Sequence, residues 1–104
     1  MLTEEQVKKI SEYMVSNNEA CYKACAKFGT NPDKYKRWRD YYSLPEVVRA
    51  VVQYDIETGE EIDYYNNKEE ALWDNYIGDD KVVRIGRQFR NWIFKVEMRY
   101  AKEE

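Results

Sequence analysis

The spacing of apolar residues in the first part of the chain predicts three short α-helices. Val7, Ile10 and Met14 recur at intervals of three and four residues, which places them on one face of a helix. Thr3 and Gln6 have the spacing of a capping box, in which each side chain bonds the backbone N–H of the other residue. We therefore expect the first helix to begin at Thr3.

The second helix is predicted from a stripe of small residues that ends in an aromatic ring. The stripe consists of Ala20, Cys21, Ala24, Cys25 and Phe28. Polar residues 16–18 are expected to end the first helix and to cap the second. Gly29 follows where helices often close with a left-handed residue, a conformation that glycine adopts without strain. In this interpretation Phe28 faces inward and fills the space between the second and third helices.

The third helix is predicted to run from Pro32 to Tyr42. Proline suits the first helical position, because the N–H that it lacks would have no partner there. Thr30 or Asn31 can cap this helix. The side chains expected on its inner face are Tyr35, Trp38 and Tyr42. The basic side chains lie mostly off that face and are Lys34, Lys36, Arg37 and Arg39.

Beyond Pro45, which blocks continuation of the third helix, the sequence becomes rich in β-branched and aromatic residues. Val47–Asp55 is predicted to be a strand, and Glu61–Tyr65 is predicted to return beside it after a turn at Thr58-Gly59. Residues 91–100 alternate apolar and polar side chains, which indicates a closing strand.

A fourth helix is predicted between these strands, capped by Asn67 and ended by Gly78. The residues expected to face inward from it are Ala71, Leu72 and Tyr76. Residues 81–90 fit two structures, either a helix or a short strand that turns back at Gly86. The helix is the interpretation adopted here.

The predicted fold class is α+β, with three N-terminal helices packed with a small three-stranded antiparallel sheet and one or two further helices. We expect a helical part, residues 1–45, and a part with the hairpin, a helix and the closing strand, residues 46–104, that share one core. Trp38 and Trp92 are expected to be largely buried.

The corner between the second and third helices resembles the helix-turn-helix of DNA-binding proteins. That motif has a small residue in its first helix, a glycine four positions later and large apolar residues around them. Here Cys25 is the small residue and Gly29 the glycine, and the apolar positions are Phe28, Tyr35 and Trp38. Residues 9–30 also look like the start of tri-helical domains in bacterial and phage regulators and transposase-like proteins. Acidic Asp33 and Asp40 depart from the pattern, as does Tyr35, where a β-branched residue is usual. An ordinary helical corner with aromatic core residues has the same spacing.

The second half of the chain resembles the nuclease-associated modular DNA-binding domain of homing endonucleases. The matching residues are Tyr54, Asp55, Gly59, Ile62, Tyr65, Glu70, Ala71, Ile77, Val82 and Phe94. This resemblance implies a second helix-turn-helix, with its turn at Ile77-Gly78 and its reading helix over residues 80–89. The stretch before the last strand is shorter than in that family, and the first helix of the module is more acidic.

The formal net charge of −3 conceals a segregated charge pattern. Residues 1–45 carry 8 basic and 6 acidic side chains, residues 46–80 carry 2 and 11, and residues 81–104 carry 7 and 3. The net charge argues against non-specific binding of nucleic acid. The segregation leaves a basic surface possible at each end of the chain, although each of these segments is also compatible with a merely solvated face.

Catalytic and cofactor motifs are missing from this sequence, which has no His, no glycine-rich phosphate loop and no nucleophile motif. Cys21 and Cys25 lack the further Cys or His that a zinc site needs, so both are expected to be small core residues. Asp79 and Asp80 lack the ligand spacing of a calcium loop. We therefore expect that the chain is not an enzyme, binds no cofactor and has no metal site.

Two classes of function remain. In the first, the chain is a small binder of double-stranded DNA, a transcriptional regulator or accessory factor of phage or mobile-element type, with Lys36 and Arg37 facing the major groove. In the second, the acidic segment 55–80 binds a protein and imitates a nucleic-acid backbone, as DNA mimics and anti-CRISPR-like phage inhibitors do. The candidate DNA-contacting residues are Asn31, Lys34, Lys36, Arg37, Arg39, Arg84, Arg87 and Arg90.

The sequence also bears on location. No apolar run approaches the roughly 18 residues of a membrane span, and the N-terminus does not resemble a signal peptide. We therefore expect a cytoplasmic protein without a membrane partner.

Overall fold

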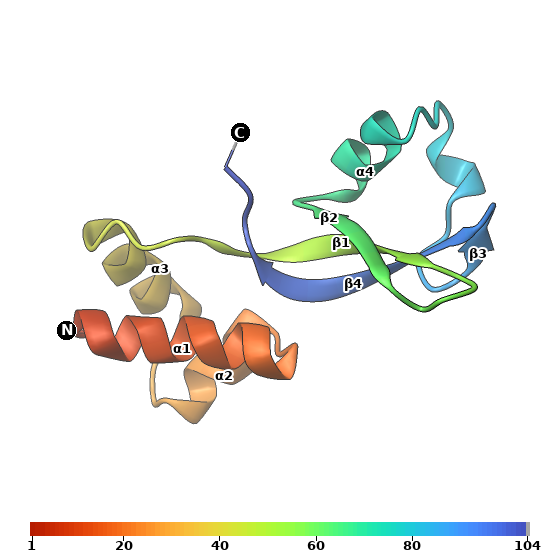
Figure 1. The fold of residues 1–104 in the computed structure, drawn as a ribbon. Coiled ribbons are helices and arrows are strands. Elements are labelled where there is room, and N and C mark those ends of the chain that lie inside the picture. Colours follow the sequence, from red (N-terminus) through yellow and green to blue (C-terminus); the bar gives the residue numbers. More distant parts are fainter. Residues whose placement is uncertain (104) are drawn as a thin grey trace. The chain divides into compact units, whose positions relative to one another are not determined.

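The protein has an α+β fold, as the sequence predicts. A computed structural model describes residues 1–103, in which three helices precede a four-stranded sheet that carries a fourth helix (Figure 1). The elements in chain order are α1 (Glu4–Asn17), α2 (Cys21–Lys27), α3 (Pro32–Tyr41), β1 (Val47–Asp55), β2 (Glu61–Tyr65), α4 (Lys68–Asp74), the short 3-10 helix η1 (Asp80–Val82), β3 (Gln88–Phe89) and β4 (Trp92–Tyr100).

Helix α1 follows the sequence signals at both ends. The capping box is confirmed, because the Thr3 N–H donates to Gln6 Oε1 at 2.8 Å and the Gln6 N–H donates to Thr3 Oγ1 at 3.2 Å. Asn18 ends the helix in the left-handed conformation, with φ of 48°. The buried apolar face of α1 consists of Val7, Ile10 and Met14, as predicted.

Helix α2 begins without the expected polar cap. Its N-cap is Ala20, which makes no side-chain hydrogen bond, so the prediction that residues 16–18 cap this helix is wrong. Asn18 is used differently, because its side-chain oxygen accepts a hydrogen bond from the Met98 N–H at 2.8 Å. The Asn18 side chain therefore bonds a residue 80 positions later in the chain instead of capping α2.

Phe28 lies outside the core, contrary to the prediction, and 42 % of its surface is exposed. Its backbone forms the C-cap of α2, and its ring packs edge-on against Tyr13, with 5.7 Å between ring centroids. The buried side chains of α2 and α3 include Ala24, Cys25 and Tyr35. Two small side chains leave room for one large ring, and Tyr35 supplies that ring.

The strands of the hairpin have the predicted bounds. Strands β1 and β2 pair antiparallel, with Val52 opposite Tyr64 and Gln53 opposite Asp63. The Asp55 carboxylate accepts the N–H groups of Glu57 and Thr58 at 2.8 and 3.0 Å and so shapes the turn. The sheet order is β2-β1-β4-β3, so the closing strand lies beside the hairpin as expected, and the two-residue strand β3 adds a fourth strand.

Residues 81–90 do not form the predicted helix. One turn of 3-10 helix at Asp80–Val82 is followed by turns and by β3. Gly86 has a φ of 82°, and its N–H donates to the Phe94 carbonyl at 2.7 Å. Because the Gly86 N–H is bonded to β4, it cannot donate to a carbonyl one helical turn earlier, as an α-helix would require. The left-handed backbone of Gly86 also turns the chain toward β4. The reading helix implied for residues 80–89 is therefore absent.

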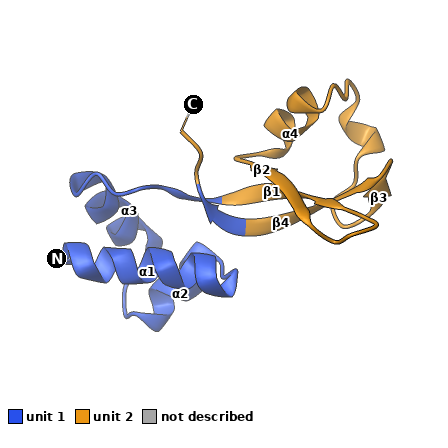
Figure 2. Ribbon diagram, in the orientation of Figure 1, with its two compact units in different colours: residues 1–48, 98–100 blue, residues 49–97, 101–104 orange. Residues whose placement is uncertain are grey.

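Two compact units make up the described chain (Figure 2). The N-terminal unit contains residues 1–48 and 98–100, and the C-terminal unit contains residues 49–97 and 101–103. The first boundary falls three residues after the expected position 45, and the end of β4 belongs to the N-terminal unit.

Each unit has its own cluster of buried apolar residues, where the sequence analysis expects one shared core. Val47 and Met98 belong to the first cluster, whereas Val51 and Phe94 belong to the second. Val47 begins β1 and Val51 lies at its middle, while Phe94 and Met98 lie four positions apart on β4. Strands β1 and β4 therefore each supply buried side chains to both clusters.

The tryptophans Trp38 and Trp92 are partly buried, and each packs against the margin of one of these clusters. Within residues 1–103, no helix combines the length and the apolar character needed to cross a membrane.

Candidate interaction surfaces

The turn between α2 and α3 has the backbone geometry of the predicted corner. Gly29 is left-handed, with φ of 73°, and the Thr30 N–H donates to the Cys25 carbonyl at 2.9 Å. The hydroxyl groups of Tyr35 and Ser11 form a buried hydrogen bond of 2.6 Å, which ties α3 to α1. Helix α3 is thus held through its inner side, which carries Tyr35.

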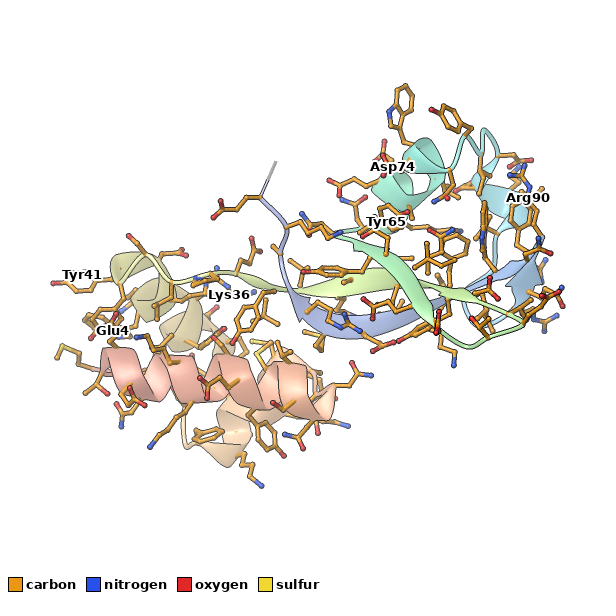
Figure 3. The ribbon with its side chains drawn as sticks, viewed as in Figure 1. Glu4, Lys36, Tyr41, Tyr65, Asp74 and Arg90 are labelled. Carbon is orange, nitrogen blue, oxygen red and sulfur yellow. The ribbon has the colours of Figure 1, made fainter. Side chains whose placement is uncertain are left out.

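Three of the predicted DNA-contacting side chains lie exposed on α3. They are Lys34, Lys36 and Arg37, of which Lys36 is labelled in Figure 3. No ion pair within residues 1–103 involves any of the three. Asn31 is also exposed, but its side-chain oxygen accepts the Lys34 N–H at 3.0 Å and caps α3. Its amide NH₂ is left to donate to a ligand.

Arg39 is not available as a DNA-contacting residue, because only 9 % of its surface is exposed. It follows buried Tyr35 by four positions and so shares its helical face. Its guanidinium lies over the Tyr35 ring, 5.7 Å from the centroid, and Nη2 donates to Asp40 Oδ1 at 3.2 Å. Arg39 is therefore a structural residue of the N-terminal unit.

The two acidic residues of α3, Asp33 and Asp40, are exposed, and the charge of each is partly compensated by its surroundings. The bond from Arg39 offsets the charge of Asp40. Asp33 lies in the first turn, where the positive end of the helix dipole stabilises a carboxylate.

The two cysteines are packing residues on the inner side of this corner. Their sulfur atoms lie 3.8 Å apart, with Cys25 buried and Cys21 half-buried. Burial raises the pKa of the Cys25 thiol to about 12; Cys21 adds to this shift and the charge of Lys36 opposes it. The Cys25 thiol therefore stays neutral near pH 7 and acts as a small apolar side chain.

The second predicted basic site, at Arg84, Arg87 and Arg90, is exposed but lies on turns rather than on a reading helix. Arg90 has a left-handed backbone, with φ of 54°, and its guanidinium lies 4.9 Å from the centroid of the Phe89 ring. The three arginines can meet phosphates at a surface, but they lack the regular spacing with which a helix presents side chains to base edges.

A surface that the sequence analysis missed lies on α4. Trp73 is 83 % exposed and Tyr76 is 94 % exposed, although Tyr76 is predicted to face inward. The reason is that α4 ends at Asp74, before the predicted stop at Gly78. Beyond Asp74 the helical periodicity that places Tyr76 inside no longer applies.

The end of α4 is a Schellman motif with an unusual residue in its left-handed position. The Ile77 N–H donates to the Leu72 carbonyl at 2.9 Å, and the Tyr76 N–H donates to the Trp73 carbonyl at 3.2 Å. Tyr76 has a φ of 57°, where glycine is the usual residue. Ile77 and Leu72 are both buried, so the motif anchors the chain on either side of Tyr76 and turns that ring outward.

A buried polar network holds this helix end against the hairpin. The Asn75 side chain accepts from Gln53 Nε2 at 3.1 Å and donates to the Tyr65 hydroxyl at 3.1 Å and the Ala71 carbonyl at 2.8 Å. The Tyr65 hydroxyl in turn donates to Gln53 Oε1 at 2.8 Å. Tyr65 on β2 and Asp74 on α4 are labelled in Figure 3. The network thereby fixes the positions of the backbone from Trp73 to Tyr76.

Trp73 stands between two hollows. One, of about 460 Å³, is lined by Trp73, Tyr76, Ile77 and Gly78. The other, of about 670 Å³, has five carboxylate residues in its wall, namely Asp63, Glu69, Glu70, Asp74 and Glu103. Its single basic residue, Lys102, is bonded to Asp63, which lowers the pKa of that carboxyl and raises the pKa of the lysine. We call Trp73, Tyr76 and the walls of these hollows the α4 surface.

Comparison with protein-family models, with curated proteins and with solved structures found no match. Within residues 1–103, no three His, Cys, Asp or Glu side chains are grouped as metal ligands would be. The candidate binding surfaces are therefore the exposed basic residues of α3, namely Lys34, Lys36 and Arg37, and the α4 surface.

Proposed function

We propose that this protein binds double-stranded DNA through α3, as a small regulator or accessory factor of phage or mobile-element type. One observation carries the proposal: the α2–α3 corner buries Tyr35 and leaves Lys34, Lys36 and Arg37 exposed without ion-pair partners in the described chain. Unpaired basic side chains on the outer side of such a corner are the groups that contact phosphates and base edges. The resemblance to helix-turn-helix proteins supports the same assignment.

The charge distribution favours a local contact rather than general attraction to nucleic acid. The N-terminal unit carries nine Lys and Arg against seven Asp and Glu, whereas the whole chain has a net charge of −3. Binding must therefore depend on a few side chains of α3. Arg37 suits guanine, since its guanidinium can form two parallel hydrogen bonds to one base.

The test measures binding of the full chain to fluorescent duplex pools at low salt. Lys36→Ala/Arg37→Ala removes two exposed charges from α3, and Lys8→Ala/Lys9→Ala removes two exposed charges from α1 as the matched control. We expect the first variant to lose affinity and to reduce the salt slope by about two, one for each lost phosphate contact. If Arg37 reads a base, Arg37→Ala alone should weaken the free energy of binding to the preferred DNA sequence by roughly 1–3 kcal/mol. The loss on other DNA sequences should be much smaller.

Equal losses in the α1 and α3 variants would contradict a specific role for α3. Absence of binding to any duplex at micromolar protein would contradict the proposal as a whole. That result would favour the other function class, in which the acidic segment 55–80 binds a protein.

A further inference from the structure

The α4 surface combines exposure and strain in a way that folding does not require. Tyr76 is almost fully exposed, so its ring contributes little to the core, and its left-handed backbone is strained for any residue with a Cβ. Glycine at this position would end α4 without that strain. Tyr76 is thus explained by what its ring can contact and not by the stability of the unit.

The residues around the two rings define the charge of a ligand. Trp73 is flanked along α4 by Glu69, Glu70 and Asp74, and the larger hollow beside it carries five carboxylates against one lysine that is already paired. Such a wall repels phosphate and attracts lysine and arginine. The faces of indole and phenol rings also attract cations, arginine most often.

We propose that the α4 surface docks a basic segment of a partner protein. In that segment an apolar side chain enters the hollow between Trp73 and Tyr76, and neighbouring arginine or lysine side chains reach the Trp73 ring and the carboxylates of the larger hollow. Exposed Trp and Tyr beside such hollows have the character of interface hot spots. The surface is pre-organised, because the Asn75 network and the Schellman motif already hold the backbone that carries both rings.

The 104-residue chain is used to select binders from a random peptide display library, and the consensus peptide is then synthesised for titration. We expect peptides that combine Arg or Lys with an apolar residue. Trp73→Ala and Tyr76→Ala should each weaken binding of that peptide about tenfold or more. Tyr41→Ala, which removes an exposed ring from α3, should leave peptide binding unchanged.

Four results would overturn the proposal: no enriched peptide, enrichment of peptides that are not basic, affinity unaffected by Trp73→Ala, or loss of affinity in Tyr41→Ala. The same variants are titrated with a labelled single-stranded DNA and examined by analytical ultracentrifugation. Binding of the single strand, or self-association, that disappears in Trp73→Ala would assign the surface to nucleic acid or to a second copy of this chain instead. Lys36→Ala/Arg37→Ala should bind the peptide normally, so failure of the DNA-binding proposal remains distinguishable.

Discussion

At the residue scale, the identity of a side chain matters less than the backbone position that carries it. Tyr35 lies within α3 and Tyr76 lies just beyond the end of α4, and the first is buried against Ser11 whereas the second is almost fully exposed. The difference arises because Tyr35 lies inside a regular helix, whereas Tyr76 occupies the left-handed residue that closes one. Arg39 shows the same effect, since its place four residues after Tyr35 puts it on the buried face of α3.

The first stability prediction follows from the left-handed backbone of Tyr76. Tyr76→Gly should raise the free energy of unfolding by about 1 kcal/mol relative to Tyr76→Ala, because glycine alone avoids the Cβ clash at this φ. For a domain of this size that difference corresponds to a melting temperature higher by about 4–8 °C. Thermal denaturation followed by circular dichroism measures it. Equal melting temperatures for the two variants would show that the backbone at Tyr76 is not strained.

At the element scale, α4 depends on side chains from two strands. The helix has only seven residues, too few to be stable alone, and its last turn is tied to β1 and β2 through Asn75. Residues 81–90 are the opposite case, where tertiary hydrogen bonds to β4 replace a helix that the local pattern allows.

We expect Asn75→Ala to lower the free energy of unfolding by about 1–3 kcal/mol, because the buried amide NH₂ of Gln53 then loses its acceptor. The matched control is Asn91→Ala, which removes an exposed side chain for which the described chain offers no hydrogen-bond partner, and it should leave stability nearly unchanged. Urea titration of both variants provides the comparison. If Asn91→Ala lowered the free energy of unfolding as much as Asn75→Ala does, the loss of stability in Asn75→Ala could not be attributed to the hydrogen-bond network.

At the scale of the whole molecule, the N-terminal unit is completed by residues 98–100, at the C-terminal end of β4. Met98 lies in the same cluster as Val7, Ile10 and Met14, and its N–H is the partner of Asn18. Strands β1 and β4 each run from one unit into the other. A fragment that ends after the third helix therefore lacks part of its own core.

Met98→Ala tests this dependence in the full chain. Truncating a buried methionine should cost about 2–5 kcal/mol, a large fraction of the stability of a small domain. Val82→Ala, at an exposed apolar position, should change stability by no more than about 0.5 kcal/mol. The free energies of unfolding are compared in urea by circular dichroism. A small loss in Met98→Ala would mean that residues 98–100 contribute little to the N-terminal unit.

Local signals in the sequence were sufficient to predict most of the secondary structure. The capping box at Thr3, a polar cap of α3 at Thr30 or Asn31, the left-handed Gly29 and the bounds of β1 and β2 are all confirmed, with Asn31 as the residue that caps α3. These features depend on atoms within a few residues of one another, so the sequence contains all that is needed to infer them.

The tertiary structure alone decided which aromatic and basic side chains are available for binding. Periodicity identifies a face, but the residues that cover it come from distant positions, as Ser11 does for Tyr35 and Gln53 for Asn75. The exposure of Phe28 and Tyr76 and the burial of Arg39 depend on such long-range contacts or on where a helix ends. The elements of this protein were therefore set by local chemistry, whereas its candidate binding surfaces were set by packing.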